Sequence, residues 1–199
     1  TRELALQLTR HDQRLRLLYH DPNRGKGYAV RRGMLAARGA EVLFLDADLS
    51  TPLSDLQLLR RAMAEHGADV AIGSRAVACS LLVQRQPWPR EMLGRLGNLA
   101  VRLLTPSLRG INDTQCGFKL FRHEAAQRTF AAGRIDRWGF DFEILALAMA
   151  MGLKVVEVGV SWRHDPHSKV RPGDYLRTLG ELLHVRARLL ARRQAGVGR

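Results

Sequence analysis

The sequence contains few cysteines, few aromatic residues and no long apolar run. Its 199 residues include two cysteines, Cys79 and Cys116, which are too few for a disulfide framework and lack metal-ligand spacing. The longest unbroken apolar stretch, residues 144–151, falls well short of the ~20 residues that cross a bilayer. The chain opens with Thr1-Arg2-Glu3, without the basic start and apolar core of a signal peptide. We therefore expect a reducing, cytoplasmic setting.

Acidic residues are also scarce. The chain has 19 Asp and Glu against 32 Lys and Arg, a formal net charge of +13. Such an excess favours polyanionic partners: nucleic acid, an anionic membrane surface or phosphorylated small molecules. Arginines dominate residues 85–109 and 186–199, where they alternate with leucine and valine. Because aromatic residues are only 6% of the chain and these clusters contain just one, Trp88, base stacking is not favoured. We expect a phosphate or membrane-surface partner and no nucleic acid.

The order of local patterns indicates an α/β fold. Short apolar runs bounded by turn residues predict strands, and apolar residues at helical spacing predict helices. The predicted strands cover 14–19, 42–45, 69–73, 118–121 and 155–162, and the predicted helices cover 1–11, 27–38, 54–65, 90–104, 142–151 and 175–193. Strands and helices that alternate in this way predict a largely parallel sheet flanked by helices. An opening helix without a preceding strand suggests that residue 1 lies inside a domain.

Two acids, Asp46 and Asp48, follow the buried strand predicted at 42–45. In an open α/β sheet this is the edge where ligands bind, and alternation along an extended chain would turn both carboxylates to one side. Two converging carboxylates repel unless a divalent cation neutralises them. Oxygen ligands favour Mg²⁺ or Mn²⁺, which would also hold a diphosphate. The alternative is a strand-end turn with two solvated acids.

Three further segments lie between predicted elements. Residues 23–27, Asn-Arg-Gly-Lys-Gly, could bring glycine amides, Lys26 and a helix N-terminus to a phosphate, or could form only a flexible basic turn. Arg75 ends a strand at the same edge, where the alternative is a surface arginine. Residues 113–119, Asp-Thr-Gln-Cys-Gly-Phe-Lys, form a candidate catalytic loop.

Two other patterns have simpler interpretations. Asp141 lies in the first turn of the helix predicted at 142–151, where capping and aromatic packing explain residues 138–143. His164 and His167 have metal-type spacing but no third ligand, so a metal site there is not favoured.

Taken together and in order, these segments resemble the polyprenyl-phosphate glycosyltransferases, and most closely the dolichyl-phosphate β-glucosyltransferase type, with the dolichyl-phosphate mannosyltransferases as relatives. The resemblance runs from the first residues to about residue 183. Its motifs are Gly25-Lys26-Gly27, Asp46-Ala47-Asp48, Gly73-Ser74-Arg75, residues 113–121, residues 138–143 and His167-Ser168-Lys169. The Asp-x-Asp triplet is common among sugar-nucleotide enzymes, whereas the 113–119 segment is far more specific.

The resemblance implies a GT-A fold, a mixed and mostly parallel sheet flanked by helices. It also implies a nucleotide-sugar donor (UDP-glucose or GDP-mannose), Mg²⁺ or Mn²⁺, and a polyprenyl or dolichyl phosphate acceptor. The roles it implies are metal binding by Asp46 and Asp48, nucleotide binding by Lys26 and Asp46, phosphate binding by Arg75, Arg95 and Lys119, and catalysis by Asp113 and Lys119. An ionised acceptor phosphate needs little help from a base, so direct displacement would invert the anomeric centre and give a β-linked product.

The chain departs from that family pattern in two places. Relatives begin with two strands that end in Pro-x-Tyr-Asn-Glu-like and Asp-Asp-Gly-Ser segments, and neither is present here. We therefore expect residues 1–174 to form an amino-terminally truncated GT-A catalytic domain lacking its first strands, which could leave this chain inactive. Some mannosyl relatives carry a metal-contacting glutamine where this chain has Ser50.

Residues 175–199 are expected to form a basic amphipathic helix and tail. Leucines at 176, 179, 182, 183 and 190 lie near one face, which suits a helix on an anionic leaflet or, equally, a terminal helix packed on the sheet. The first interpretation predicts a peripheral enzyme on the cytoplasmic face of a membrane. Two other functions are alternatives: a sugar nucleotidyltransferase, which would release pyrophosphate, and a nucleic-acid-binding protein selected by charge alone.

Overall fold

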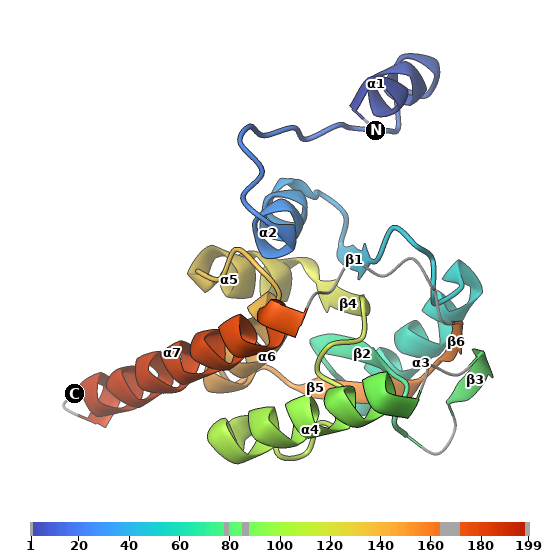
Figure 1. The fold of residues 1–199 in the computed structure, drawn as a ribbon. Coiled ribbons are helices and arrows are strands. Elements are labelled where there is room, and N and C mark those ends of the chain that lie inside the picture. Colours follow the sequence, from blue (N-terminus) through green and yellow to red (C-terminus); the bar gives the residue numbers. More distant parts are fainter. Residues whose placement is uncertain (1, 78–79, 85–87, 164–171, 198–199) are drawn as a thin grey trace.

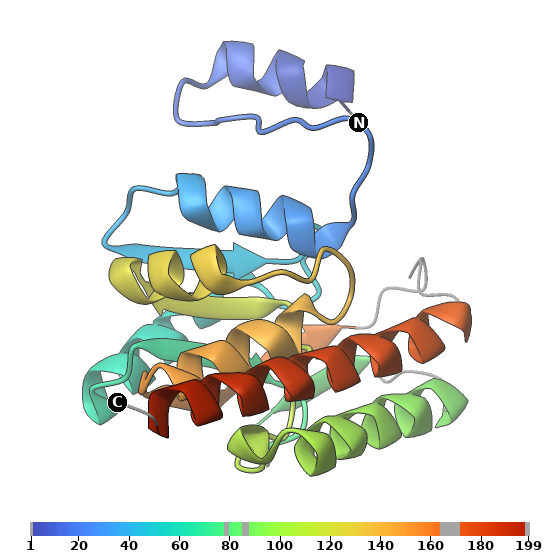
Figure 2. The same ribbon diagram turned by 90° about the vertical axis from the view of Figure 1, so that its left-hand side faces the viewer.

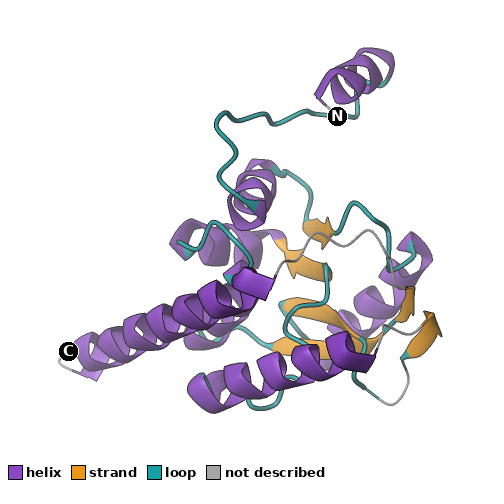
Figure 3. Ribbon diagram, in the orientation of Figure 1, coloured by secondary structure: helices purple, strands orange, loops and turns teal. Residues whose placement is uncertain are grey.

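The computed structural model describes residues 2–77, 80–84, 88–163 and 172–197. Its helices are α1 (Arg2–His11), α2 (Lys26–Ala36), α3 (Leu56–His66), α4 (Trp88–Leu104), α5 (His123–Ala132), α6 (Phe140–Ala150) and α7 (Pro172–Val197), with 3₁₀ turns at Leu53–Asp55 and Pro106–Leu108. Its strands are β1 (Glu41–Leu45), β2 (Val70–Ser74), β3 (Leu81–Gln84), β4 (Phe118–Arg122), β5 (Val155–Gly159) and β6 (Ser161–Arg163). Figure 3 shows these helices and strands with the loops between them.

The main sheet is mixed, with strand order β1-β4-β2-β5. Strand β4 runs antiparallel to both of its neighbours, whereas β2 and β5 pair in parallel. Consequently β1, β2 and β5 point the same way and β4 alone is reversed. A second, two-stranded sheet pairs β3 with β6 in parallel. The segment predicted as one strand at 155–162 is therefore two strands that belong to different sheets.

Helices cover both faces of the main sheet (Figures 1 and 2). Alternation along β2 sends Val70 and Ile72 into one apolar cluster and Ala71 into the other. The first cluster includes side chains of α2, α5 and α6, and the second includes Leu59 and Met63 of α3. Because both faces are packed, every residue of β2 is buried.

Helix α7 belongs to the packed body of the molecule. It contacts α6 and α4, and its Leu182 and Val185 are each 2% exposed within the larger apolar cluster. Figure 2 shows α7 crossing in front of α6 above α4. One face of this helix is thus packed on α6 and α4. Leu179, Leu183 and Leu190 remain exposed.

None of the described helices is long and apolar enough to cross a membrane.

The amino-terminal segment differs most from its prediction. Residues 14–19, predicted as a strand, form none: residue 14 lies in a turn, and residues 15–19 have no regular secondary structure. Helix α1 forms as predicted, yet none of its residues is buried, and Figure 1 shows it apart from the other elements. A strand exists only where a neighbouring backbone accepts and donates its hydrogen bonds, and apolar alternation alone does not supply that neighbour.

Candidate functional site

The topology brings three predicted segments to one edge of the main sheet. Asp46 follows the carboxyl end of β1, and Arg75 follows the carboxyl end of β2. Because β4 is antiparallel to both, its amino-terminal end lies at that same edge, and the loop that precedes it carries Asp113. The reversed strand between β1 and β2 therefore places the 113–117 loop beside both strand ends.

Lys26, the first residue of α2, contacts the acid that follows β1. Its Nζ lies 2.7 Å from Oδ1 of Asp46. The ammonium also faces the rings of Phe44, Trp138 and Phe140 at 5.5–5.7 Å from their centroids. Burial alone would lower the pKa of Lys26, but the nearby carboxylates, led by Asp141 and Asp46 and including Asp48, raise it above its usual value. The lysine is therefore a fixed positive charge at this edge.

The Asp46–Asp48 segment forms a turn, so the extended alternation expected for it is wrong. The Asp46 N–H donates to the Gly117 carbonyl at 2.8 Å, and the Leu49 N–H donates back to the Asp46 carbonyl at 3.1 Å. Leu49 has a φ of 51°, in the left-handed region. Oδ1 of Asp48, an exposed residue, accepts the Ser50 N–H at 3.0 Å. Both carboxylates nevertheless help to raise the pKa of the same residue, Lys26.

The surroundings of Asp46 suit a divalent cation. A Cβ on Gly117 would lie 2.0 Å from Oδ2 of Asp46, so only glycine leaves room for this carboxylate. Lys26 already places one cation against the same side chain. Two carboxylates offer the oxygen donors that Mg²⁺ and Mn²⁺ prefer. No cluster of three acidic, His or Cys side chains occurs in the described part of the chain, so phosphate or water would complete the coordination.

The glycines of the 23–27 segment allow close packing against the 135–140 segment. Gly25 has a φ of 113°, and a Cβ there would lie 2.5 Å from the Asp136 carbonyl oxygen. Arg24 and Arg31 both pair with the Asp136 carboxylate, at 2.9 Å and 2.5 Å. The segment is thus held in place and is not a free basic turn. An open hollow of about 500 Å³ lies beside it, lined by residues 18–21, Asn23, Gly25, Lys26 and Ala29.

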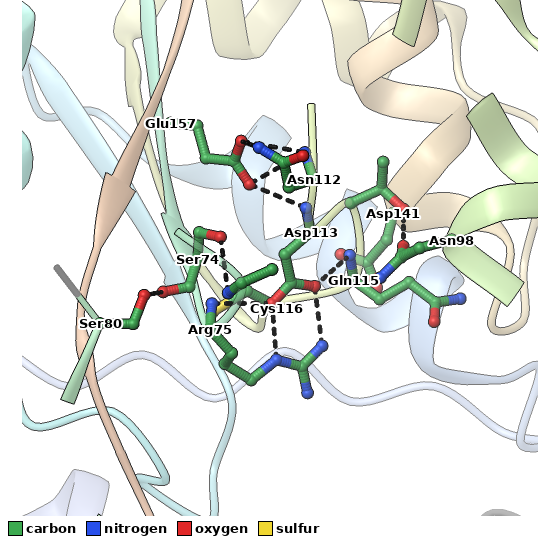
Figure 4. Close-up of polar contacts among 12 residues, drawn as sticks. Ser74, Arg75, Ser80, Asn98, Asn112, Asp113, Gln115, Cys116, Asp141 and Glu157 are labelled. Carbon is green, nitrogen blue, oxygen red and sulfur yellow. Dashed lines mark hydrogen bonds and ion pairs between the residues drawn. The ribbon is translucent and has the colours of Figure 1, made fainter. Parts of the chain in front are cut away.

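Arg75 and Asp113 form a bidentate ion pair (Figure 4). Nε and Nη2 of Arg75 donate to the two carboxylate oxygens of Asp113 at 2.6 Å and 2.8 Å, and the Arg75 N–H donates at 3.0 Å. The Asp113 side chain is 2% exposed and that of Arg75 is 27% exposed. Burial alone would raise the pKa of Asp113, but Arg75, with Lys119, holds it below its usual range. Asp113 is therefore ionised and occupied by an arginine.

Glu157 of β5 fixes the loop that carries Asp113. Its carboxylate accepts the backbone N–H groups of Asn112 and Asp113 at 2.8–3.1 Å (Figure 4). The Thr114 hydroxyl donates to Oδ1 of Asn98 in α4 at 3.0 Å. Neither Glu157 nor Asn98 was predicted as a site residue from the sequence. The available signal for Glu157 was its place as the only acid of the apolar strand Val155–Gly159.

Lys119 lies on β4 and is 1% exposed. Its ammonium pairs with the Asp141 carboxylate and donates to the Cys116 carbonyl at 2.6 Å. Asp141 of α6 is thus an ion-pair partner as well as a first-turn acid. Burial, assisted by Asp113, raises the pKa of the Cys116 thiol to about 12, which leaves it protonated. Lys119 is therefore buried in an ion pair with Asp141. Its predicted contact with phosphate stays a prediction.

Some predicted residues fall outside the described part of the structure. Arg95 belongs to α4, but its side chain is not described. His164, His167 and Lys169 lie in the undescribed segment 164–171. The predictions made for these residues stay predictions.

The sequence matches the model of the family described as "Glycosyl transferase family 2" over residues 1–130. The chain belongs to this family. It is 36% identical over 181 residues to "Dolichyl-phosphate beta-glucosyltransferase" of Dictyostelium discoideum, covering 88% of this chain and 55% of that protein. The protein of the same name from Drosophila melanogaster is 39% identical over 165 residues, covering 80% of this chain and 50% of that protein. The chain thus spans about half the length of the curated relatives it matches.

Solved structures of other glycosyltransferases share the fold of this family 2 chain. Glucosyl-3-phosphoglycerate synthase from Mycobacterium tuberculosis, in complex with phosphoglyceric acid, is 18% identical, with a TM-score of 0.57. The match covers 92% of this chain and 57% of that one. The same enzyme in complex with Mn²⁺, UDP and glucosyl-3-phosphoglycerate gives the same TM-score and coverage. The predicted GT-A class, a mixed sheet flanked by helices, is confirmed.

Proposed function

We propose that this chain is the catalytic part of an inverting glucosyltransferase that moves glucose from UDP-glucose to dolichyl or another polyprenyl phosphate. The observation that carries the proposal is the meeting, at one sheet edge, of the Asp46–Asp48 turn, Lys26 and the anchored guanidinium of Arg75. The acids suit a cation that binds a diphosphate, and Arg75 suits a phosphate. The names of the relatives at 36–39% identity support glucose as the sugar and dolichyl phosphate as the acceptor.

Asp46 and Asp48 would hold a divalent ion at the end of β1. When bound, such an ion neutralises the negative charge that develops on the leaving diphosphate. Lys26 lies 2.7 Å from Asp46 and would add a second positive charge on the same side. The hollow beside Lys26, about 500 Å³, is within the size range of small-molecule sites and would take the nucleoside.

Arg75 would orient the acceptor phosphate. Asp113 holds Nε and Nη2 of its guanidinium, and the remaining N–H groups of Arg75 would bind oxygens of the phosphate. An acceptor phosphate, with a second pKa of about 6, is already ionised at neutral pH and needs no strong base. Asp113, with its lowered pKa, is a poor base, so its role is to position Arg75. Direct attack on the anomeric carbon of an α-linked donor gives a β-linked product.

A polyprenyl acceptor lies in a membrane, so the protein would work at a membrane surface. The net charge of +13 favours an anionic leaflet, and we place the protein peripherally on the cytoplasmic face, where nucleotide sugars are made available.

The test is a transfer assay on the whole protein with dolichyl phosphate, Mg²⁺ and radiolabelled UDP-glucose or GDP-mannose. We expect label in the organic phase from UDP-glucose, released again by mild acid as glucose. Label from GDP-mannose alone would contradict the choice of sugar. Release of pyrophosphate from UTP and glucose 1-phosphate, without any lipid product, would contradict the proposal and favour a nucleotidyltransferase.

A further inference from the structure

Helix α4 has two apolar faces, only one of which is covered. Its inner face carries Val101 and, just beyond the helix, Thr105, which are 3% and 1% exposed. The opposite face carries Met92, Leu96, Leu99 and Leu103, which are 40%, 55%, 48% and 60% exposed. Positions i, i+4, i+7 and i+11 form a continuous stripe on a helix. We call these four residues the α4 stripe.

The charge around the α4 stripe is mainly positive, because Glu91 is the only acid between residues 88 and 112. No acid occurs between residues 92 and 112, whereas Arg95, Arg102 and Arg109 fall in that interval. Arg109 is exposed and Arg102 half-buried. From α7, the exposed Arg186 approaches the carboxyl end of α4, with Nη1 3.5 Å from the Leu104 carbonyl oxygen. An apolar stripe beside several arginines complements a surface that is apolar inside and negatively charged outside.

The inner face of the same helix contacts the candidate site. Oδ1 of Asn98 accepts a hydrogen bond from Thr114, the residue that follows Asp113 (Figure 4). Helix α4 therefore supports the loop that anchors Arg75 on one side and exposes leucines on the other. Whatever covers the α4 stripe lies one helix diameter, roughly 10 Å, from that loop.

We infer that the α4 stripe docks the protein on an anionic lipid leaflet, with α4 lying in the plane of the interface. Leucine side chains would enter the boundary of the acyl chains while Arg102, Arg109 and Arg186 contact lipid phosphates. The inference rests on the proposed function in one respect. If the acceptor is embedded in the membrane, docking through α4 would bring its phosphate to Arg75. It adds the surface through which the protein reaches that acceptor.

The test is sedimentation of the 199-residue chain with vesicles of phosphatidylcholine, with or without 30% phosphatidylserine. The double variant L96S/L99S is compared with L53S/L58S, a matched control on exposed leucines of the 3₁₀ turn and α3. We expect L96S/L99S to lower the partition coefficient for the anionic vesicles at least tenfold and the control to change it less than twofold. Binding of the unmodified chain should also weaken as salt rises.

A second measurement does not depend on removing leucines. A polarity-sensitive fluorophore on L103C should shift to the blue with anionic vesicles, and one on L58C should not, both with Cys79 replaced by serine. Equal binding of the two double variants, or equal shifts at both labelled positions, would overturn the inference. So would a dimer of the unmodified chain that L96S/L99S converts to a monomer, because a second copy would then cover the stripe.

Transfer to a short, water-soluble prenyl phosphate separates the two proposals. L96S/L99S should keep this activity, since neither leucine contacts the site. If no transfer occurs with any acceptor while anionic vesicles still bind through the α4 stripe, the docking inference holds and the proposed function fails.

Discussion

The ends of β1 and β2 carry two ion pairs that differ in how firmly they are held. At β1, Lys26 and Asp46 meet through one 2.7 Å contact, and their side chains are 26% and 30% exposed. At β2, Arg75 donates three hydrogen bonds to Asp113, whose side chain is 2% exposed. A partly exposed acid with a single contact can exchange its partner for an incoming ion, whereas a buried acid with several bonds does so much less readily.

The comparison assigns different roles to two acids that look alike in the sequence. Asp46 is available to a cation because it is partly exposed and makes a single ion-pair contact, with Lys26. Asp113 is not available, because Arg75 and the Gln115 N–H occupy its oxygens. The first acid therefore suits ligand binding and the second suits positioning. Three substitutions and one pH dependence test this division, in order of decreasing expected effect.

D46N should have the largest effect on transfer. The amide keeps the shape of the side chain but loses the charge that would bind a cation, so we expect transfer to fall about 10²–10³-fold. Because Asp46 is partly exposed, the melting temperature should change little. The matched control is D12N, which removes a similarly exposed, ion-paired carboxylate just after α1 and should keep full activity. Transfer within threefold of the unmodified protein in D46N would contradict the role of this acid.

D113N should affect stability most. It leaves the Arg75 guanidinium partly buried without its counter-charge, and breaking a buried pair of this kind costs about 3–5 kcal/mol of unfolding free energy. The control is R60Q, which breaks the half-exposed Arg60–Glu41 pair and should cost less than about 1 kcal/mol. Urea denaturation measures both. Equal losses in the two variants would remove the distinction between the two strand ends.

The same pair predicts how stability depends on pH. Arg75 and Lys119 outweigh burial and hold the pKa of Asp113 below its usual value. A carboxyl group of this kind contributes stability that is complete above the unfolded pKa of about 3.9 and is lost as the pH falls through the lower folded pKa. The difference in unfolding free energy between the unmodified chain and D113N should stay constant from pH 7 to 5 and shrink below pH 4. A difference that grows on acidification would contradict the ionised pair.

K26Q should have the smallest effect, and it should change the affinities for Mn²⁺ and for UDP in opposite directions. Removing the ammonium beside Asp46 removes a competing cation, so Mn²⁺ alone should bind a few-fold more tightly. UDP should bind a few-fold more weakly, because one positive charge near the diphosphate is lost. Titration calorimetry measures both affinities. If both changed in the same direction, Lys26 would not be an exchangeable partner of Asp46.

Much of the fold could be predicted because its elements carry strong local patterns. The unbroken apolar run at 42–45 became β1, and the strand predicted at 69–73 became β2. Helix α5 was missed because its buried residues include small alanines, Ala125 and Ala126, which give no large apolar stripe. The strand predicted at 14–19 failed because strand formation depends on a pairing partner and not on its own residues.

The individual residues of the candidate site were predicted from the sequence, but the ion pairs between them were not. The motifs placed Asp46 and Arg75 at one sheet edge, and the reversed direction of β4 explains why Asp113 joins them. The pairing of Arg75 with Asp113 spans 38 residues, and that of Lys119 with Asp141 spans 22. No local spacing encodes such contacts, because only the packed sheet and α6 bring the partners together.

The most direct test of the account is Mn²⁺ binding in the presence of UDP-glucose, followed by the electron paramagnetic resonance signal of the free ion. The unmodified protein should remove free Mn²⁺ saturably at one ion per chain, and D46N/D48N should remove none beyond the level of the protein-free control. Equal Mn²⁺ binding by the two proteins would contradict the claim that the turn after β1 holds the cation.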